Sequence, residues 1–105
     1  MNPSLDRESL DRYAPKLAAL SQEILFDDIW QRPELSARDR SLVTLSVLAA
    51  QGRVQQIPWH LQFARQNGLS ETEITELFTH LAFYAGWPAA VSALGCLAAE
   101  ERECR

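Results

Sequence analysis

Residues 42–50 read LVTLSVLAA, and this stretch decides the fold class. It is apolar on nearly every side when it is wound into a helix, so we expect it to be the central, buried helix of the molecule. Ser36 followed by Asp39 is typical of a helix N-cap with an acidic third residue, and Gly52 suits the far end. The sequence therefore predicts a helix between Ser36 and Gly52.

Glycine and proline divide the rest of the chain into further helices. Pro15 and Pro58 fit the first turns of two of them, because proline is tolerated there. Ser70 with Glu73 makes a capping box for another. No stretch shows sustained polar–apolar alternation, so the predicted fold is all-α, with about five or six helices in one bundle. The additional helices are expected at Leu5–Tyr13, Pro15–Leu25, Val54–Asn67, Ser70–Gly86 and Pro88–Glu103.

Length and charge limit the class of protein. A chain of 105 residues suits a single domain, residues 1–105. The net charge of -4 and the scattered Lys and Arg speak against a nucleic-acid partner. No apolar run reaches the roughly 18 residues of a membrane span, and the N-terminus lacks the basic start and apolar stretch of a signal peptide. We therefore expect a cytoplasmic protein without a membrane partner.

The two cysteines are badly placed for thiol redox chemistry. Cys96 and Cys104 stand eight residues apart, whereas a redox pair is typically Cys-x-x-Cys. Cys96 lies in a run rich in Ala and Leu and is interpreted as a small buried hydrophobe. Two histidines and two distant cysteines do not form the ligand pattern of a zinc site. The sequence predicts neither redox cysteines nor a metal site.

His60 is the polar residue that interrupts an otherwise apolar helix face. Ile57, Leu61 and Ala64 form the stripe of the predicted Val54–Asn67 helix that should face inward, and His60 lies on the same stripe. A core histidine whose ring is hydrogen-bonded by a carbonyl is one interpretation. An acid–base group is the other, because the pKa of imidazole is easily moved across neutrality.

Arg40 is a candidate anion-binding residue at the start of the buried helix. A surface salt bridge is the simpler interpretation for a guanidinium in a first helical turn. The functional alternative is a clamp, because the planar guanidinium can hold a carboxylate at two points. The sequence alone leaves both open.

The predicted Ser70–Gly86 helix has a second, aromatic-rich face. Glu76, His80 and Tyr84 are spaced by four residues, and Phe83 and Trp87 flank them. Such a face implies a second contact surface, and we favour a subunit interface over a pocket wall. An ordinary i, i+4 contact between Glu76 and His80 is the simpler alternative.

Several stretches together resemble the carboxymuconolactone decarboxylase family. The similarity covers residues 25–98, and the stretches that carry it are WQRPEL at 30–35, RDRSLVT at 38–44, QIPWHL at 56–61, NGLS at 67–70 and HLAFYAGWPA at 80–89. The resemblance implies an all-α helical-hairpin bundle of the alkylhydroperoxidase-D-like type. It also implies a homo-oligomer, a trimer or hexamer, with pockets at or near the subunit contacts.

The resemblance separates two chemical branches. The thiol branch carries Glu-x11-Cys-x2-Cys-x3-His, and the positions aligned with the glutamate and the two cysteines are Ser41, Arg53 and Gln56. Only the histidine, His60, is kept. Because Arg and Gln cannot replace a thiolate nucleophile, disulfide exchange at this site is excluded.

The other branch includes the cofactor-free decarboxylase that acts on γ-carboxymuconolactone in aromatic-compound degradation. This branch implies a lyase that needs no cofactor, with His60 as the proton donor and Arg40 as the binder of a carboxylate or oxyanion. His80 and Tyr84 are expected in the wall of the substrate pocket. A non-catalytic, small-molecule-binding oligomer is the alternative, and a peroxidase working through Cys96 or Cys104 is a further one.

Overall fold

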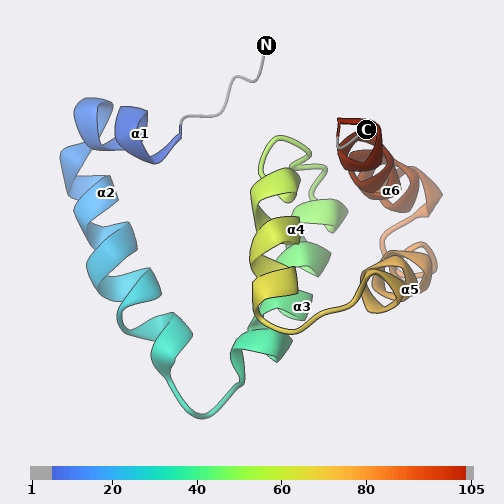
Figure 1. Cartoon of the computed structure of the whole chain (residues 1–105), viewed down its shortest axis with the longest axis horizontal. Helices are drawn as coiled ribbons and strands as arrows, with labels where there is room; N and C mark the ends of the chain where they lie inside the picture. Colours follow the sequence, from blue (N-terminus) through green and yellow to red (C-terminus); the bar gives the residue numbers. More distant parts are fainter. Residues whose placement is uncertain (1–5, 104–105) are drawn as a thin grey trace. The chain divides into compact units, whose positions relative to one another are not determined.

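The computed structural model describes the backbone of residues 6–103 and the side chains of residues 6–100. Every regular element in this part of the chain is helical (Figure 1), which confirms the all-α prediction. The chain divides into two compact units, Met1–Ala37 and Arg38–Arg105, which are taken separately below. The expectation of a single domain stays a prediction. Leu5 and Cys104 lie outside the described residues.

The first unit is a succession of short helical segments. Asp6 caps the first helix by accepting a 2.7 Å hydrogen bond from the backbone N–H of Ser9. Pro15 occupies the first turn of the second helix, as predicted. This helix continues without a break into a wider, π-helical segment, so the predicted Pro15–Leu25 helix forms with two different windings. The segments are α1 (Arg7–Tyr13), α2 (Pro15–Leu20), η1 (Ser21–Phe26) and η2 (Ile29–Gln31).

The second unit contains four longer helices around one apolar core. They are α3 (Ala37–Ala50), α4 (Ile57–Gln66), α5 (Glu71–Leu81) and α6 (Trp87–Glu103), coloured from green to red in Figure 1. Each helix contributes buried side chains to the same cluster, so the four helices fold as one body. The largest fully buried side chains are Leu45, Ile57, Leu61, Ile74 and Phe78.

The helix built from residues 42–50 is not buried on all sides. In α3 one stripe is buried, formed by Ser41, Leu45 and Ala49 at successive turns. Val43 and Val47 on another side are 56% and 46% exposed. The expectation of a fully buried central helix is therefore wrong for a single chain, because the bundle covers only one side of α3.

The capping box was predicted correctly, whereas the length of the helix that follows it was not. Ser70 and Glu73 form the predicted capping box at the start of α5. That helix ends at Leu81 rather than at Gly86, because residues 82–85 form turns. Gly68, which follows α4, has φ +103°, a left-handed conformation that suits glycine at the end of a helix. No helix formed by the described residues is long and apolar enough to cross a membrane.

Candidate functional site

His60 lies on α4 at the border between the core and the surface. Its neighbours on the predicted stripe, Ile57 and Leu61, are fully buried, whereas His60 is half-buried. The imidazole packs edge-on against Trp59, with ring centroids 4.8 Å apart, and 6.4 Å from the ring of Phe63. Among the side chains and backbone groups of residues 6–100, none hydrogen-bonds to the imidazole nitrogens. The carbonyl bond that the core-histidine interpretation expects is therefore not found in this part of the chain.

The surroundings of His60 favour its neutral form. Partial burial lowers the pKa of the imidazole below its ordinary value, because the charged form loses hydration. At neutral pH the ring is thus mostly uncharged, with one nitrogen donating and one accepting. A proton placed on this ring is given away readily, which suits a group that takes part in proton transfer.

Arg40 lies in the first turn of α3 and is half-buried. Its backbone carbonyl accepts a 2.8 Å hydrogen bond from the hydroxyl of Thr44. His60 and Arg40 do not share either of the two grooves described below for the second unit. The geometry of a single chain therefore does not bring the predicted proton donor and the predicted anion binder into one of these grooves.

A groove of about 640 Å³ runs between α3 and α5. His80 lines it, and the ring of Tyr84 stacks on His80 with centroids 4.9 Å apart. Two of the predicted pocket residues therefore do lie together. The apolar lining is Leu42, Val43, Val47, Leu77 and Leu81, and the polar lining is Arg38, Ser46, Glu73, Glu76 and His80.

Arg38 is a groove residue that sequence reasoning missed. Its guanidinium donates a hydrogen bond to the Glu73 carboxylate and lies 3.5 Å from a carboxylate oxygen of Asp39. A backbone hydrogen bond from Ser70, together with Arg38, lowers the pKa of Glu73. The sequence held a signal for this position, because the four-residue spacing of Arg38 and Leu42 places both on one side of a helix. The structure shows that this side lines the groove.

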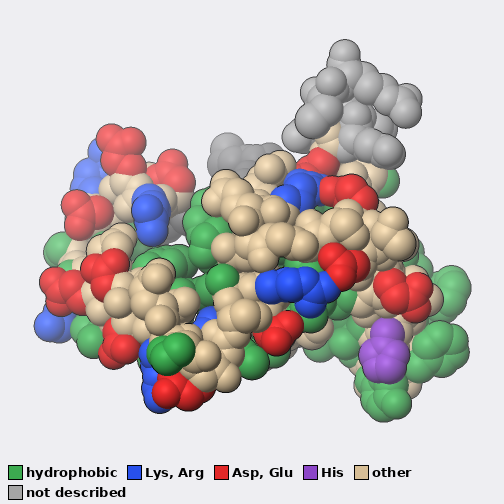
Figure 2. Space-filling view, turned by 60° about the horizontal axis from the view of Figure 1, so that its bottom comes forward, with side chains coloured by type: hydrophobic (Ala, Val, Ile, Leu, Met, Phe, Trp, Pro, Cys, Tyr) green, Lys and Arg blue, Asp and Glu red, His purple; other side chains and the backbone are tan. Residues whose placement is uncertain are grey.

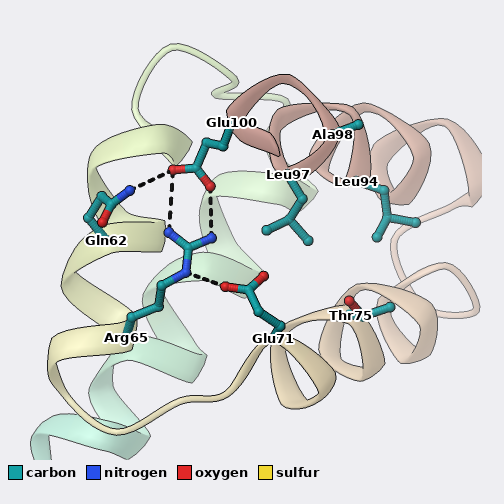
Figure 3. Close-up of a pocket in the computed structure, with 8 residues that line it drawn as sticks. All are labelled: Gln62, Arg65, Glu71, Thr75, Leu94, Leu97, Ala98 and Glu100. Carbon is teal, nitrogen blue, oxygen red and sulfur yellow. Dashed lines mark hydrogen bonds and ion pairs between the residues drawn. The ribbon is translucent and has the colours of Figure 1, made fainter. Parts of the chain in front are cut away.

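A second groove, of about 560 Å³, is closed on one side by a charged network (Figure 3). Arg65 donates to Glu71 of α5 and, at 2.8 Å, to Glu100 of α6. Gln62 donates to the same Glu100 carboxylate at 3.0 Å. The two carboxylates, Glu100 foremost, raise the pKa of Arg65. This guanidinium is saturated by carboxylates of its own chain, so it joins three helices rather than offering an anion site.

Three aromatic side chains form an exposed surface, here called the aromatic face. Phe83, Tyr84 and Trp87 are 82%, 79% and 71% exposed. On the right of the view in Figure 2, hydrophobic side chains gather around a histidine. Exposed aromatic groups this close together are typical of a surface that contacts a partner. The second, aromatic-rich face expected for the predicted Ser70–Gly86 helix is thus exposed, and it lies in the turn between α5 and α6 and at the start of α6.

The positions that hold the glutamate and the two cysteines in the thiol branch have other residues and other contacts in this chain. Ser41 is buried, and its hydroxyl accepts a 3.0 Å hydrogen bond from Asn67, which ties α3 to the end of α4. Arg53 and Gln56 lie in the turn before α4. Burial raises the pKa of the half-buried Cys96 thiol, which makes it a poor nucleophile. Among the described residues, no three His, Cys, Asp or Glu side chains converge as metal ligands.

Comparison with known proteins shows sequence similarity to one family and to two named decarboxylases. Residues 15–99 match the model of the carboxymuconolactone decarboxylase family. A 4-carboxymuconolactone decarboxylase of Acinetobacter baylyi is 34% identical over 87 residues, which cover 83% of this chain and 65% of the relative. A nitrosuccinic acid decarboxylase of Metarhizium robertsii is 36% identical over 75 residues, which cover 71% of this chain and 52% of the relative. The chain thus spans between half and two thirds of these relatives.

Proposed function

The chain belongs to the carboxymuconolactone decarboxylase family, and we propose that it is a cofactor-independent decarboxylase of a small carboxylated lactone such as γ-carboxymuconolactone. The names of two relatives agree in decarboxylation and differ in substrate. Their common feature is the loss of CO2 from a small carboxylic acid, and this is the reaction class we assign. The observation that carries the proposal is that the imidazole of His60 is half-buried and has no hydrogen-bond partner among the described residues.

His60 is proposed as the proton donor. When the C–C bond to the carboxylate breaks, its electron pair passes into the neighbouring carbonyl as an enolate, and a carbon atom must then accept a proton. The protonated fraction of His60 donates that proton and becomes neutral, the form its half-buried site favours, and a proton from solvent then restores the imidazolium. The proposal is supported by the imidazole nitrogens having no hydrogen-bond partner among the described residues.

Arg40, His80 and Tyr84 are proposed to bind the substrate. Arg40 holds a carboxylate of the substrate or the developing oxyanion, because a guanidinium offers two parallel donors. The stacked His80 and Tyr84 rings form part of the pocket wall. Since His60 and Arg40 share neither groove of one chain, we propose that the pocket is completed in a homo-oligomer, a trimer or hexamer. The exposed aromatic face supports assembly.

The test is turnover of γ-carboxymuconolactone by the purified protein without added cofactor. We expect His60→Ala to lower kcat by about 10²- to 10⁴-fold, the usual contribution of a positioned proton donor. Gln66→Ala is the matched control, because Gln66 is exposed on the same helix. Both variants should keep the mass of the wild-type assembly.

Two results would overturn parts of this proposal. Unchanged turnover in His60→Ala would remove His60 from the mechanism. If the wild-type protein turned over none of a panel of lactones and keto acids, yet was thermally stabilised by some of them, the non-catalytic binding function would replace the lyase.

A further inference from the structure

His60 contacts two aromatic side chains of its own helix. The ring centroids of Trp59 and His60 are 4.8 Å apart, with an angle of 80° between the ring planes. Those of His60 and Phe63 are 6.4 Å apart, at an angle of 68°. Both distances lie in the range of about 4.5–7 Å in which edge-to-face aromatic pairs attract each other. The imidazole therefore packs against two aromatic rings at once.

The contact between Trp59 and His60 does not follow from their adjacency in the sequence. Consecutive side chains of a helix point about 100° apart and do not face each other. Trp59 and Phe63 are four residues apart, a spacing at which helix side chains do meet, and their ring centroids are 5.0 Å apart. Phe63 thus braces the indole of Trp59, and the indole in turn lies against the imidazole.

Trp59 and Phe63 lie outside the apolar core of the second unit. Trp59 is 49% exposed, and Phe63 is half-buried. Neither belongs to the cluster of buried core side chains or to the partly buried hydrophobic side chains that pack against this cluster. Packing of the core therefore does not explain why a large indole stands beside His60.

The orientation of a catalytic histidine is usually fixed by a hydrogen bond. One ring nitrogen donates to a carboxylate or a backbone carbonyl, and the other nitrogen is left for the substrate. Among the described residues no group forms a hydrogen bond or an ion pair with the imidazole of His60. Its orientation in this part of the chain therefore depends on how the ring packs, and Trp59 and Phe63 are rings that pack against it.

We propose that Trp59 is a positioning residue for His60 and that Phe63 supports it by bracing the indole. The two rings restrict rotation of the imidazole and keep it in the orientation from which it protonates the carbon atom that has lost CO2. The inference rests on the proposed function, in which His60 is the proton donor, and it adds the residues that orient this donor.

The first test is turnover of γ-carboxymuconolactone by two variants of Trp59. Trp59→Leu removes the ring and keeps an apolar side chain, whereas Trp59→Phe keeps a ring that can contact the imidazole. We expect Trp59→Leu to lower kcat by about 10- to 100-fold with little change in KM, since a small misplacement of a catalytic group has effects of this size. Trp59→Phe should recover most of this loss. Gln66→Leu is the matched control, because it introduces leucine at an exposed position of α4.

A double variant separates positioning from direct contact with the substrate. If Trp59 acts through His60, Trp59→Leu should not lower kcat further in the His60→Ala background, because the side chain that it orients is gone. An equal loss of kcat in both backgrounds would show that the indole acts on the substrate directly, and it would overturn the proposal. Circular dichroism should show the wild-type helical content in every variant, because Trp59 lies outside the core.

NMR of the histidine rings provides a readout that does not require turnover. The chain has two histidines, and the resonances that disappear in His60→Gln identify those of His60. Neighbouring aromatic rings displace imidazole resonances from their positions in free imidazole, so Trp59→Leu should move those of His60 toward these positions. Unchanged His60 resonances would overturn the proposal even if turnover fell.

Failure of the proposed function gives a different pattern of results. If the wild-type protein turns over no substrate, or if His60→Ala keeps full turnover, the role of His60 as proton donor falls and the catalytic role of Trp59 falls with it. The NMR spectra then still decide whether the indole holds the imidazole in place.

Discussion

The half-buried imidazole of His60 makes stability depend on pH in a defined direction. In the unfolded chain the pKa of histidine is about 6.5, and burial lowers it in the folded chain. Between these two pKa values the unfolded state binds more protons. The free energy of unfolding therefore falls as the pH drops through about 6.5 and levels off below the folded pKa.

We predict that His60→Gln removes this loss of stability in acid. Urea unfolding at pH 8 and pH 5 should show a smaller decrease in the free energy of unfolding for His60→Gln than for the wild type. His80→Gln is the control and should follow the wild-type curve, because His80 is exposed on α5. Equal acid losses in His60→Gln and the wild type would contradict the assigned burial effect.

At the scale of residues, helical periodicity predicted well which side chains are buried. It predicted poorly which partners the long side chains contact. The buried stripe at Ile57, Leu61 and Ala64 was predicted because a helix repeats every 3.6 residues. Arg38 and the contacts of Arg65 were both missed. Both guanidiniums reach carboxylates on other helices, 35 residues away in the cases of Glu73 and Glu100. Spacing along one helix carries no information about such partners.

At the scale of elements, one carboxylate both caps a helix and joins two helices. Glu73 accepts a 3.0 Å hydrogen bond from the backbone N–H of Ser70, and the Ser70 hydroxyl accepts one from the N–H of Glu73 at 3.1 Å. The other Glu73 oxygen accepts the hydrogen bond from Arg38 of α3. The start of α5 is therefore fixed both locally and against the neighbouring helix.

We predict that Ser70→Ala lowers the free energy of unfolding by about 1 kcal/mol, the usual effect of removing an N-cap acceptor. Ser70→Asp should stay within about 0.5 kcal/mol of the wild type, because aspartate is an equally good cap. Chemical unfolding followed by circular dichroism measures both. A Ser70→Ala protein as stable as Ser70→Asp would contradict a capping role.

Helix starts were more predictable than helix windings and ends. The starts at Ala37 and Glu71 follow Ser36 and Ser70, residues with local capping chemistry. The π-helical segment Ser21–Phe26 was not predicted, because a change in winding leaves no mark in the apolar spacing. The early end of α5 at Leu81 was also missed, since residues 82–85 are compatible with a helix.

At the scale of the molecule, Arg65 connects α4, α5 and α6. We predict that Arg65→Ala lowers the free energy of unfolding by about 1–3 kcal/mol, because the Glu100 carboxylate, only 16% exposed, loses its charged donor. Glu71→Gln is the milder control and should change stability by less than about 1 kcal/mol, since Glu71 is 61% exposed. Thermal or urea unfolding tests both, and equal effects would contradict the central role of Glu100.

The sequence predicted the fold class and left the site incomplete. Helical periodicity and caps suffice for an all-α bundle, because both are local. The α3–α5 groove brings together residues as far apart as Arg38 and His80, and only packing determines that distance. The exposure of Val43 and Val47 was likewise unforeseen, because a helix that is apolar on nearly every side does not reveal which side the other helices cover.

The turn between α5 and α6 has a consequence for the lifetime of the free chain. Phe83 and Tyr84 stand in that turn and are largely exposed. Exposed turns are preferred sites of proteolytic cleavage, and a protease with a hydrophobic specificity pocket selects aromatic residues. An isolated chain therefore presents a cleavage site where its last two helices join. Assembly through the aromatic face would shield it, so unassembled copies would be the ones degraded.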